Sequence, residues 1–451
     1  MLRSLTIENF KTWKKASLQF GRITGLFGTN SSGKSSIIQF LLLLKQTKEA
    51  TDRAISIELN GSYVNLGGFQ DVIHLHDVKN ELRWVVEFKA DDPVNIVDPS
   101  QRRKSIVRSD DIRVEGVVAL GAEGPVSRRI SYQVGDNQSF SLTAKRNESS
   151  SFELKAGGGD FRFIRTPGRA WQIPGPIKGY AFPDQARTYF QNASFLADLE
   201  AFYDFQMDKI YYLGPLRDYP KREYVWARSR PRDVGLRGEK AIDAILAATL
   251  AGETRNLKPK ARLKSFQEMV AYWLREMGLI HSFEVSELAK NSNYWQTFVV
   301  VREGGPKALL TDVGFGISQV LPIITLLYFV PEGSTVILEQ PEIHLHPLAQ
   351  ANLADLIVNV AENRNVQVII ESHSEHLLLR LQRRIAEGVM SKEDVEMYFC
   401  EAQDGSSRMS KLNVDIYGNI LNWPKNFMGD AFGETLAAEK ARLKRMEAAT
   451  E

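Results

Sequence analysis

A short glycine-rich stretch carries the residues best suited to hold phosphate. Residues 28–35 read GTNSSGKS and fit the pattern G-x-x-x-x-G-K-[ST]. The glycines allow a tight loop whose backbone N–H groups point at phosphate oxygens, and a following helix adds partial positive charge. In this pattern the lysine reaches the β- and γ-phosphates, and the last hydroxyl is a ligand of Mg²⁺. The candidate nucleotide-binding residues here are Gly28, Asn30, Gly33, Lys34, Ser35 and Ser36, with Ser35 also a candidate metal ligand.

A second stretch, VILEQPEIHLHP at residues 336–347, follows an apolar run with acidic residues. Glu339 is the candidate that holds Mg²⁺ through water, because carboxylate oxygens suit this hard cation. The next residue is Gln340, which cannot accept a proton as a glutamate base would, although its amide can orient a water. Glu342 is the alternative source of a carboxylate, and an engineered replacement of glutamate by Gln340 is a third explanation. We favour Gln340 in a slow reaction, since a long-lived triphosphate state suits a switch.

Both stretches lie where predicted strands end. Residues 21–28 predict a strand that runs into the phosphate loop, and the apolar residues after the loop predict a helix. From about 282 to 400 strands and helices alternate again. Between these α/β segments, short strands are expected up to about 145, a mobile connection at 146–161, and mainly helices at 184–278.

These residues support a resemblance to a known family. LTIENFK (5–11) and FGRITGLFGTNSSGKSSII (20–38) resemble the N-terminal lobe of ABC-type ATPase heads of the SMC, RecN and OLD class. Asn30 matches the family's G-x-N-x-x-G-K variant of the loop. The resemblance implies an α/β, ABC-type P-loop ATPase head that binds ATP and Mg²⁺ between two heads. A homodimer or higher homo-oligomer is therefore expected.

The resemblance also implies three further site motifs. DVGFGISQVLPII (312–324) is similar to the signature motif, in which Gly316 and Ser318 would contact the γ-phosphate held by a partner head. His373 follows a strand and resembles the switch histidine that senses the γ-phosphate. Gln70 stands where the Q-loop is expected and is a candidate contact for Mg²⁺ or the attacking water. A zinc site made from the histidines at 344–376 is the alternative, although no cysteine joins it.

The region between the motifs must be globular, because the chain lacks the sustained apolar heptads of a long coiled coil. The head is therefore expected to be split by a globular β-rich and helical insertion. The predicted division is an N-terminal ATPase lobe at 1–75, a β-rich insertion at 76–180, a helical insertion at 181–281, a C-terminal ATPase lobe at 282–400 and a small C-terminal domain or tail at 401–451.

Bulk properties restrict the partners and the location. The 57 basic and 55 acidic residues give a net charge of +2, which does not by itself demand nucleic acid or membrane. One cysteine excludes an internal disulfide framework, and charged residues interrupt the N-terminus before any signal-peptide core, so a cytoplasmic protein with no membrane partner is expected. Residues 217–240 combine cations with aromatics and are a candidate DNA contact.

The resemblance favours an ATP-binding and hydrolysing switch or scaffold. Bacterial relatives of this kind often serve anti-phage defence, so a separate nuclease or toxin effector is the expected partner. Two alternatives stay open, namely a DNA-repair or DNA-processing ATPase stimulated by DNA, and an ATP-binding interaction module with little turnover.

Overall fold

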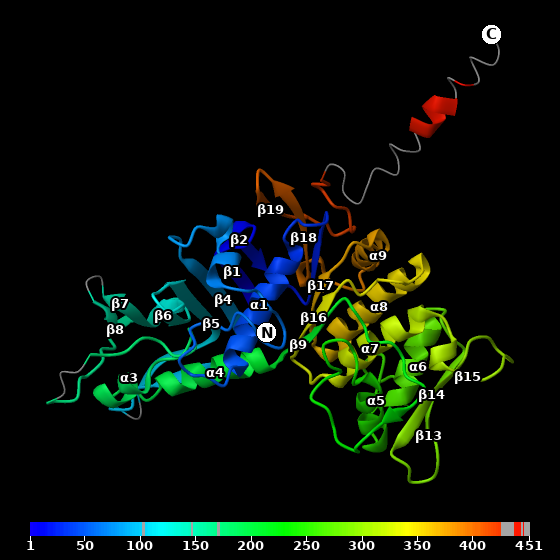
Figure 1. Ribbon diagram of the computed structural model, residues 1–451, viewed down its shortest axis with the longest axis horizontal. Helices are drawn as coiled ribbons and strands as arrows, with labels where there is room; N and C mark the ends of the chain where they lie inside the picture. Colours follow the sequence, from blue (N-terminus) through cyan, green and yellow to red (C-terminus); the bar gives the residue numbers. More distant parts are fainter. Residues whose placement is uncertain (102–103, 146–147, 169–171, 425–436, 443–444, 446–451) are drawn as a thin grey trace.

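A computed structural model describes the chain except residues 102–103, 146–147, 169–171, 425–436, 443–444 and 446–451 (Figure 1). Two large β-sheets organise it. The first has seven antiparallel strands in the order β2-β1-β4-β5-β6-β7-β8. Their bounds are β1 Leu2–Phe10, β2 Trp13–Gln19, β4 Leu82–Val97, β5 Ser105–Leu120, β6 Pro125–Val134, β7 Gln138–Lys145 and β8 Glu148–Gly157.

The second sheet has six strands in the order β19-β18-β3-β17-β16-β9, and all but β19 run parallel to their neighbours. The bounds are β3 Ile23–Gly28, β9 Ile210–Leu213, β16 Thr335–Glu339, β17 Gln367–Glu371, β18 Val395–Gln403 and β19 Ser406–Lys411. The parallel strands are nearly continuous apolar runs, as expected for strands covered on both faces. Parallel pairing brings the carboxyl ends of β3, β17, β16 and β9 to one edge of the sheet.

Helices cover the two faces of this second sheet and make two cores. Helix α1 (Lys34–Glu49) starts just after β3 and lies between the two sheets, where Phe40 and Leu41 are fully buried. The other face carries a group of helices that share a core with it (Figure 1). They are α5 Ala241–Leu250, α6 Phe266–Glu276, α7 Phe315–Phe329, α8 Pro347–Arg364 and α9 Glu375–Ala386. Alternate strand residues point to opposite faces, so Leu26 belongs to one core and Phe27 to the other.

The predicted β-rich insertion contains the expected strands, but they continue the N-terminal sheet. Strand β4 pairs with β1, with Ile7 opposite Trp84, so one sheet runs across the boundary predicted at residue 75. The mobile connection predicted at 146–161 was wrong at residues 148–157, whereas residues 158–161 lie in neither helix nor strand. Residues 148–157 form β8, which pairs with β7 because Phe152 and Leu154 alternate toward the core and are buried.

Residues 181–281 are divided between the two cores. Helices α3 (Asp184–Tyr189) and α4 (Leu196–Asp208) pack on the seven-stranded sheet, with the Phe88 and Phe202 rings meeting edge-on at 5.9 Å. Helices α5 and α6 instead pack on the far face of the second sheet. Strand β9 follows α4 directly and forms an edge of the second, six-stranded sheet, in a region where the sequence predicted mainly helices.

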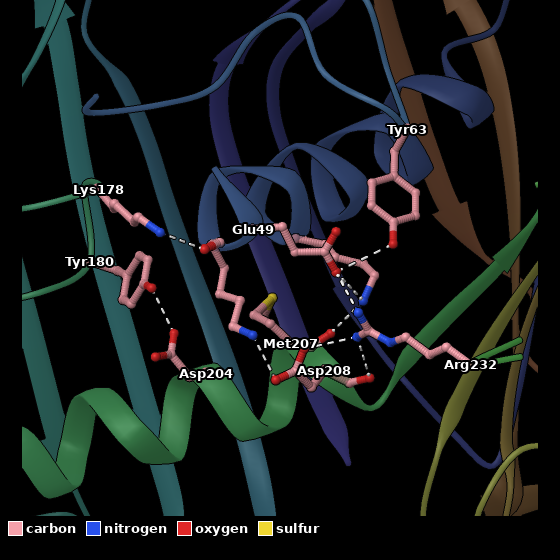
Figure 2. Close-up of polar contacts among 10 residues, drawn as sticks. Glu49, Tyr63, Lys178, Tyr180, Asp204, Met207, Asp208 and Arg232 are labelled. Carbon is pink, nitrogen blue, oxygen red and sulfur yellow. Dashed lines mark hydrogen bonds and ion pairs between the residues drawn. The ribbon is translucent and has the colours of Figure 1, made fainter. Parts of the chain in front are cut away.

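A polar cluster ties the end of α1 to the rest of the molecule (Figure 2). Lys45 is 1% exposed and lies 3.3 Å from Glu49, and it also donates to the Met207 carbonyl at 3.0 Å. Arg232 bridges Glu49 at 3.2 Å and Asp208, at the end of α4, at 2.9 Å. The helix that begins at the phosphate loop is therefore held at its far end by the end of α4 and by Arg232.

Smaller elements complete the described chain. Strands β10 (Tyr224–Val225), β14 (Tyr294–Val300), β13 (Ser282–Glu287) and β15 (Ala308–Leu309) form a four-stranded sheet, and β11 (Thr254–Arg255) pairs with β12 (Lys264–Ser265). The small C-terminal domain or tail predicted at 401–451 lies partly outside the described residues, and within it residues 437–442 are helical and exposed. None of the described helices is long and apolar enough to cross a membrane.

Candidate functional site

The phosphate loop connects β3 to α1 with a backbone that requires glycine. Gly28 has φ 137°, and a Cβ there would lie 2.0 Å from the Cys400 carbonyl oxygen. Gly33, with φ 87°, caps α1. The side chain of Lys34 is 3% exposed, and its Nζ donates to the Gly28 and Thr29 carbonyls at 3.1 and 2.7 Å. The ammonium group therefore sits inside the loop that the sequence assigned to phosphate.

Three carboxylates gather beside this loop, at the carboxyl edge of the parallel sheet. Glu339 ends β16 and Glu371 ends β17, and the two residues are register partners. Glu371 Oε1 accepts a hydrogen bond from the Ser35 hydroxyl at 2.8 Å. Glu342 is 7% exposed, and its Oε1 accepts from the His373 backbone N–H at 2.7 Å. The second oxygens of Glu342 and Glu371 are buried without a hydrogen-bond partner.

Burial and mutual repulsion make these carboxylates costly to ionise. Burial, with the charge of Glu371, raises the pKa of Glu339 to about 7. Burial also raises the pKa values of Glu342 and Glu371, although the Ser35 hydroxyl partly offsets this at Glu371. Burial lowers the pKa of Lys34. An excess of buried carboxylate over cation is therefore the dominant electrostatic feature of the site.

This arrangement fits a magnesium ion held together with phosphate. Mg²⁺ commonly takes one or two carboxylates, substrate phosphates and water, which the Ser35 hydroxyl, Glu339 and the unpartnered Glu371 oxygen can complement. Within the described ranges no three His, Cys, Asp or Glu side chains form a group able to hold a metal alone. The zinc alternative therefore gains no support, because four-coordinate zinc needs such a group.

Sequence reasoning missed three residues of this site: Glu371, Tyr212 and Arg217. Glu371 had a signal, because it ends the apolar run VII (368–370) just as Glu339 ends VIL (336–338). Tyr212 lies on β9, and the charge of Glu339 acts on its hydroxyl. Arg217 follows β9, and its Nη2 lies 3.5 Å from the Glu339 carbonyl oxygen. Both reach the site only through the parallel pairing of β9 with β16.

The structure brings two predicted catalytic residues to the same edge. Gln340 has φ 42°, and its backbone N–H donates to the Glu371 carbonyl at 2.8 Å. His373 lies just beyond β17, and partial desolvation together with the charge of Lys34 lowers its pKa. A neutral imidazole near the phosphate loop can donate one N–H to a phosphate oxygen.

The signature motif lies where α7 begins, but Ser318 points into its own helix. Its side chain is buried, and its hydroxyl donates to the Phe315 carbonyl at 2.8 Å. Gly314 and Gly316 leave the backbone at this helix start open, since a Cβ at either would meet no atom closer than 3.6 Å. Backbone N–H groups there are better placed than the Ser318 hydroxyl to meet an outside phosphate.

Gln70 lies apart from the cluster, whereas the basic segment begins beside it at Arg217. Gln70 is exposed on α2 (Phe69–Val72), and no hydrogen bond among the described residues joins it to Ser35 or Glu339. The segment that carries Gln70 instead contacts the turn at residue 11, because His74 Nδ1 lies 2.8 Å from the Lys11 carbonyl oxygen.

In the segment 217–240 most arginines pair with carboxylates, so little cationic charge is left for nucleic acid. These pairs are Arg222–Asp312, Arg228–Glu287, Arg230–Glu253, Arg232–Asp208 and Arg237–Asp218.

A phosphate loop between a central parallel strand and a helix, facing acids on neighbouring strands, defines a P-loop ATPase domain. A family model described as "AAA domain, putative AbiEii toxin, Type IV TA system" matches residues 23–380, and the chain belongs to this family. Residues 390–437 match a model described as a protein of unknown function (DUF3696). No curated protein matches the chain.

The solved structures to which the chain is similar include three SMC head domains. A head bound to the C-winged helix domain of ScpA gives a TM-score of 0.44 at 12% identity, covering 92% of this chain and 98% of that one. The head from Thermotoga maritima gives 0.40 at 11%, covering 92% and 99%. A head with an extended coiled coil, bound to the C-terminal domain of ScpA derived from Pyrococcus furiosus, gives 0.43 at 11%, covering 91% and 96%.

Proposed function

We propose that this chain binds ATP with Mg²⁺, hydrolyses it slowly, and acts as a nucleotide-driven switch for a separate effector. The observation that carries the proposal is the meeting of Lys34 and Ser35 with three buried carboxylates at one sheet edge. A magnesium ion would neutralise part of this buried negative charge. Lys34 would turn from the loop carbonyls to the β- and γ-phosphates, because a charged phosphate is a stronger acceptor than a neutral carbonyl.

Two residues compete for the role of activating water. Gln340 can only orient it, whereas Glu342 holds one oxygen on the His373 backbone and leaves the other unpartnered. A carboxylate that is fixed through one oxygen, and whose pKa is raised by burial, can accept a proton from water at its other oxygen. This geometry supports Glu342 as the base, with Gln340 orienting the water and slowing turnover relative to a glutamate at that position.

Phosphate release from ATP tests the hydrolysis directly. Lys34→Ala should abolish release, because the β/γ charge loses its fixed cation. Lys14→Ala, on an exposed position of β2, is the matched control and should behave as wild type. Equal release by all three proteins would contradict the assignment of the phosphate loop.

A second copy of the chain would complete the site. In this arrangement the start of α7 from one copy, at Gly314 to Gly316, would donate backbone N–H groups to the γ-phosphate bound by the other. Gly314→Glu would repel that phosphate without crowding the fold, because a Cβ at Gly314 meets nothing within 4 Å. Mixing Gly314→Glu with Lys34→Ala protein should restore part of the activity. Absence of rescue in mixed oligomers that demonstrably form would refute sharing between copies.

The effector role rests on the family description, which names a putative toxin of a toxin–antitoxin system. A switch of this kind, in anti-phage defence, would hold or release the product of a neighbouring gene according to the bound nucleotide. Co-expression with that product and size-exclusion chromatography in Mg²⁺ with ATP or ADP test this. A complex is expected in one nucleotide state only, and co-elution independent of nucleotide would contradict the switch.

A further inference from the structure

The segment after β9 holds an arginine rigidly at the edge of the site. Gly214 N–H donates to the Leu236 carbonyl and Asp218 N–H donates to the Arg237 carbonyl, both at 2.9 Å. These bonds fix both ends of the turn that carries Arg217. Because β9 pairs with β16 up to Leu213, the turn comes out beside Glu339.

The guanidinium group of Arg217 lacks the acceptors that a buried cation normally has. Its Nε and Nη1 are buried without a hydrogen-bond partner, and Nη2 has only the Glu339 carbonyl at 3.5 Å. The buried Arg364 is a useful contrast, because it donates to the Leu327 and Val330 carbonyls at 2.8 and 3.0 Å. A buried donor without an acceptor costs free energy, so a group left in this state calls for a functional explanation.

The group remains a cation at neutral pH, since burial lowers the pKa of Arg217 only to about 10. The charges of Tyr212, Glu339 and Glu342 favour its positive form, yet no carboxylate among the described residues forms an ion pair with it. Glu342 acts electrostatically on both Arg217 and Lys34, so both cations belong to one charged cluster. Arg217 lies beside Glu339, whose register partner Glu371 accepts a hydrogen bond from Ser35 of the phosphate loop.

We propose that Arg217 is a catalytic residue that donates its unpartnered N–H groups to the terminal phosphate of the nucleotide bound by the same chain. The inference rests on the proposed ATPase function and names a further residue of that site. A planar guanidinium suits this task, because its forked donors match phosphate oxygens and can bind two of them at once.

Arg217 would stabilise the charge that develops on the phosphate oxygens during hydrolysis. The water oxygen forms a bond to the γ-phosphorus, while the bond from that phosphorus to the β–γ bridging oxygen breaks. ADP keeps the electron pair of the broken bond, and the proton of the water passes to the unpartnered oxygen of Glu342. The products are ADP and inorganic phosphate, and no further reactant is needed.

The test compares ATP with ADP, because only ATP carries the phosphate that Arg217 would contact. The proteins are wild type, Arg217→Gln, Arg217→Lys and, as control, Arg222→Gln, whose arginine lies in the same segment but is exposed and paired with Asp312. Isothermal titration with Mg²⁺ gives both affinities, and single-turnover mixing gives the hydrolysis rate. Arg217→Gln should weaken ATP binding about 10- to 100-fold and ADP binding less than about twofold. It should slow hydrolysis by about 10³-fold or more.

Arg217→Lys should recover part of the ATP affinity but little of the rate, because it keeps the charge and loses the fork. A further variant, Arg217→Met, tests for a structural role. Its melting temperature without nucleotide should not fall below that of wild type, since the change removes a buried cation without acceptors. Equal weakening of ATP and ADP, or a large loss of stability, would assign Arg217 a structural role instead. Wild-type behaviour of Arg217→Gln would overturn this inference alone, whereas a wild-type protein that binds no ATP would overturn the proposed function as well.

Discussion

Replacing Glu342 by glutamine separates its two possible roles, because the two oxygens of this side chain have different surroundings. Oε1 accepts the His373 backbone N–H at 2.7 Å, and a glutamine oxygen can keep that bond. Oε2 has no partner and becomes an NH₂ group, which cannot accept a proton. The change therefore removes the base while preserving the anchor of the segment after β17.

The size of the effect follows from the chemistry that is lost. Loss of a general base typically slows a reaction ~10²- to 10⁴-fold, which corresponds to about 3–5 kcal/mol of activation free energy. Because burial raises the pKa of Glu342, the neutral amide should not destabilise the fold. We therefore expect a large loss of rate with an unchanged or higher melting temperature.

Single-turnover hydrolysis with Mg²⁺ and excess enzyme is the assay, since it isolates the chemical step from product release. Gln340→Glu is the companion variant, and it should accelerate hydrolysis by supplying a second carboxylate next to Glu339. A Glu342→Gln rate within about threefold of wild type would refute the assignment of Glu342 as the base. Hydrolysis would then rest on water orientation by Gln340 alone.

Three further predictions concern stability. Because the folded pKa of Glu339, about 7, lies above its ordinary 4.5, the folded state binds more protons, so nucleotide-free stability should fall as pH rises from 4.5 through 7. Glu339→Gln should reduce this pH-dependent decrease in the free energy of unfolding by up to about 3 kcal/mol, as measured by urea unfolding at each pH. An unchanged pH profile would contradict this. Gly28→Ala should abolish ATP binding and lower the melting temperature, since its Cβ would lie 2.0 Å from the Cys400 carbonyl oxygen; a stable variant that binds ATP would contradict it. Lys45→Ala should lower the free energy of unfolding in urea by about 3 kcal/mol, because it leaves Glu49 with one cation fewer in a partly buried cluster. Lys48→Ala, which removes a more exposed ion pair, should lower it less, and equal losses would contradict this.

The sequence predicted the parts of the site that depend on neighbours in the chain. The loop at 28–35, its flanking strand and helix, and the apolar run before Glu339 are local patterns, and each element is present. Strand β8 was missed because Ser and Gly dominate its surroundings, although the alternation of Phe152 and Leu154 was a usable signal.

The remaining features depend on strand pairing between distant segments. Glu371 reaches Glu339 because β17 lies beside β16, and Arg217 arrives through β9, more than a hundred residues earlier in the chain. No pattern of neighbouring residues predicts which distant strands pair in the sheet. The continuity of β1 with β4, which crosses the predicted boundary at residue 75, was hidden for the same reason.

Equilibrium binding of ATP to the purified wild-type protein, measured by isothermal titration with and without Mg²⁺, tests the central claim most directly. The three buried carboxylates at the sheet edge predict saturable binding that is much tighter with Mg²⁺, because ATP alone would add negative charge to the site. Lys34→Ala should lose this binding while keeping its melting temperature. Absence of saturable binding, or binding equally tight without Mg²⁺ and unaffected by Lys34→Ala, would contradict the account.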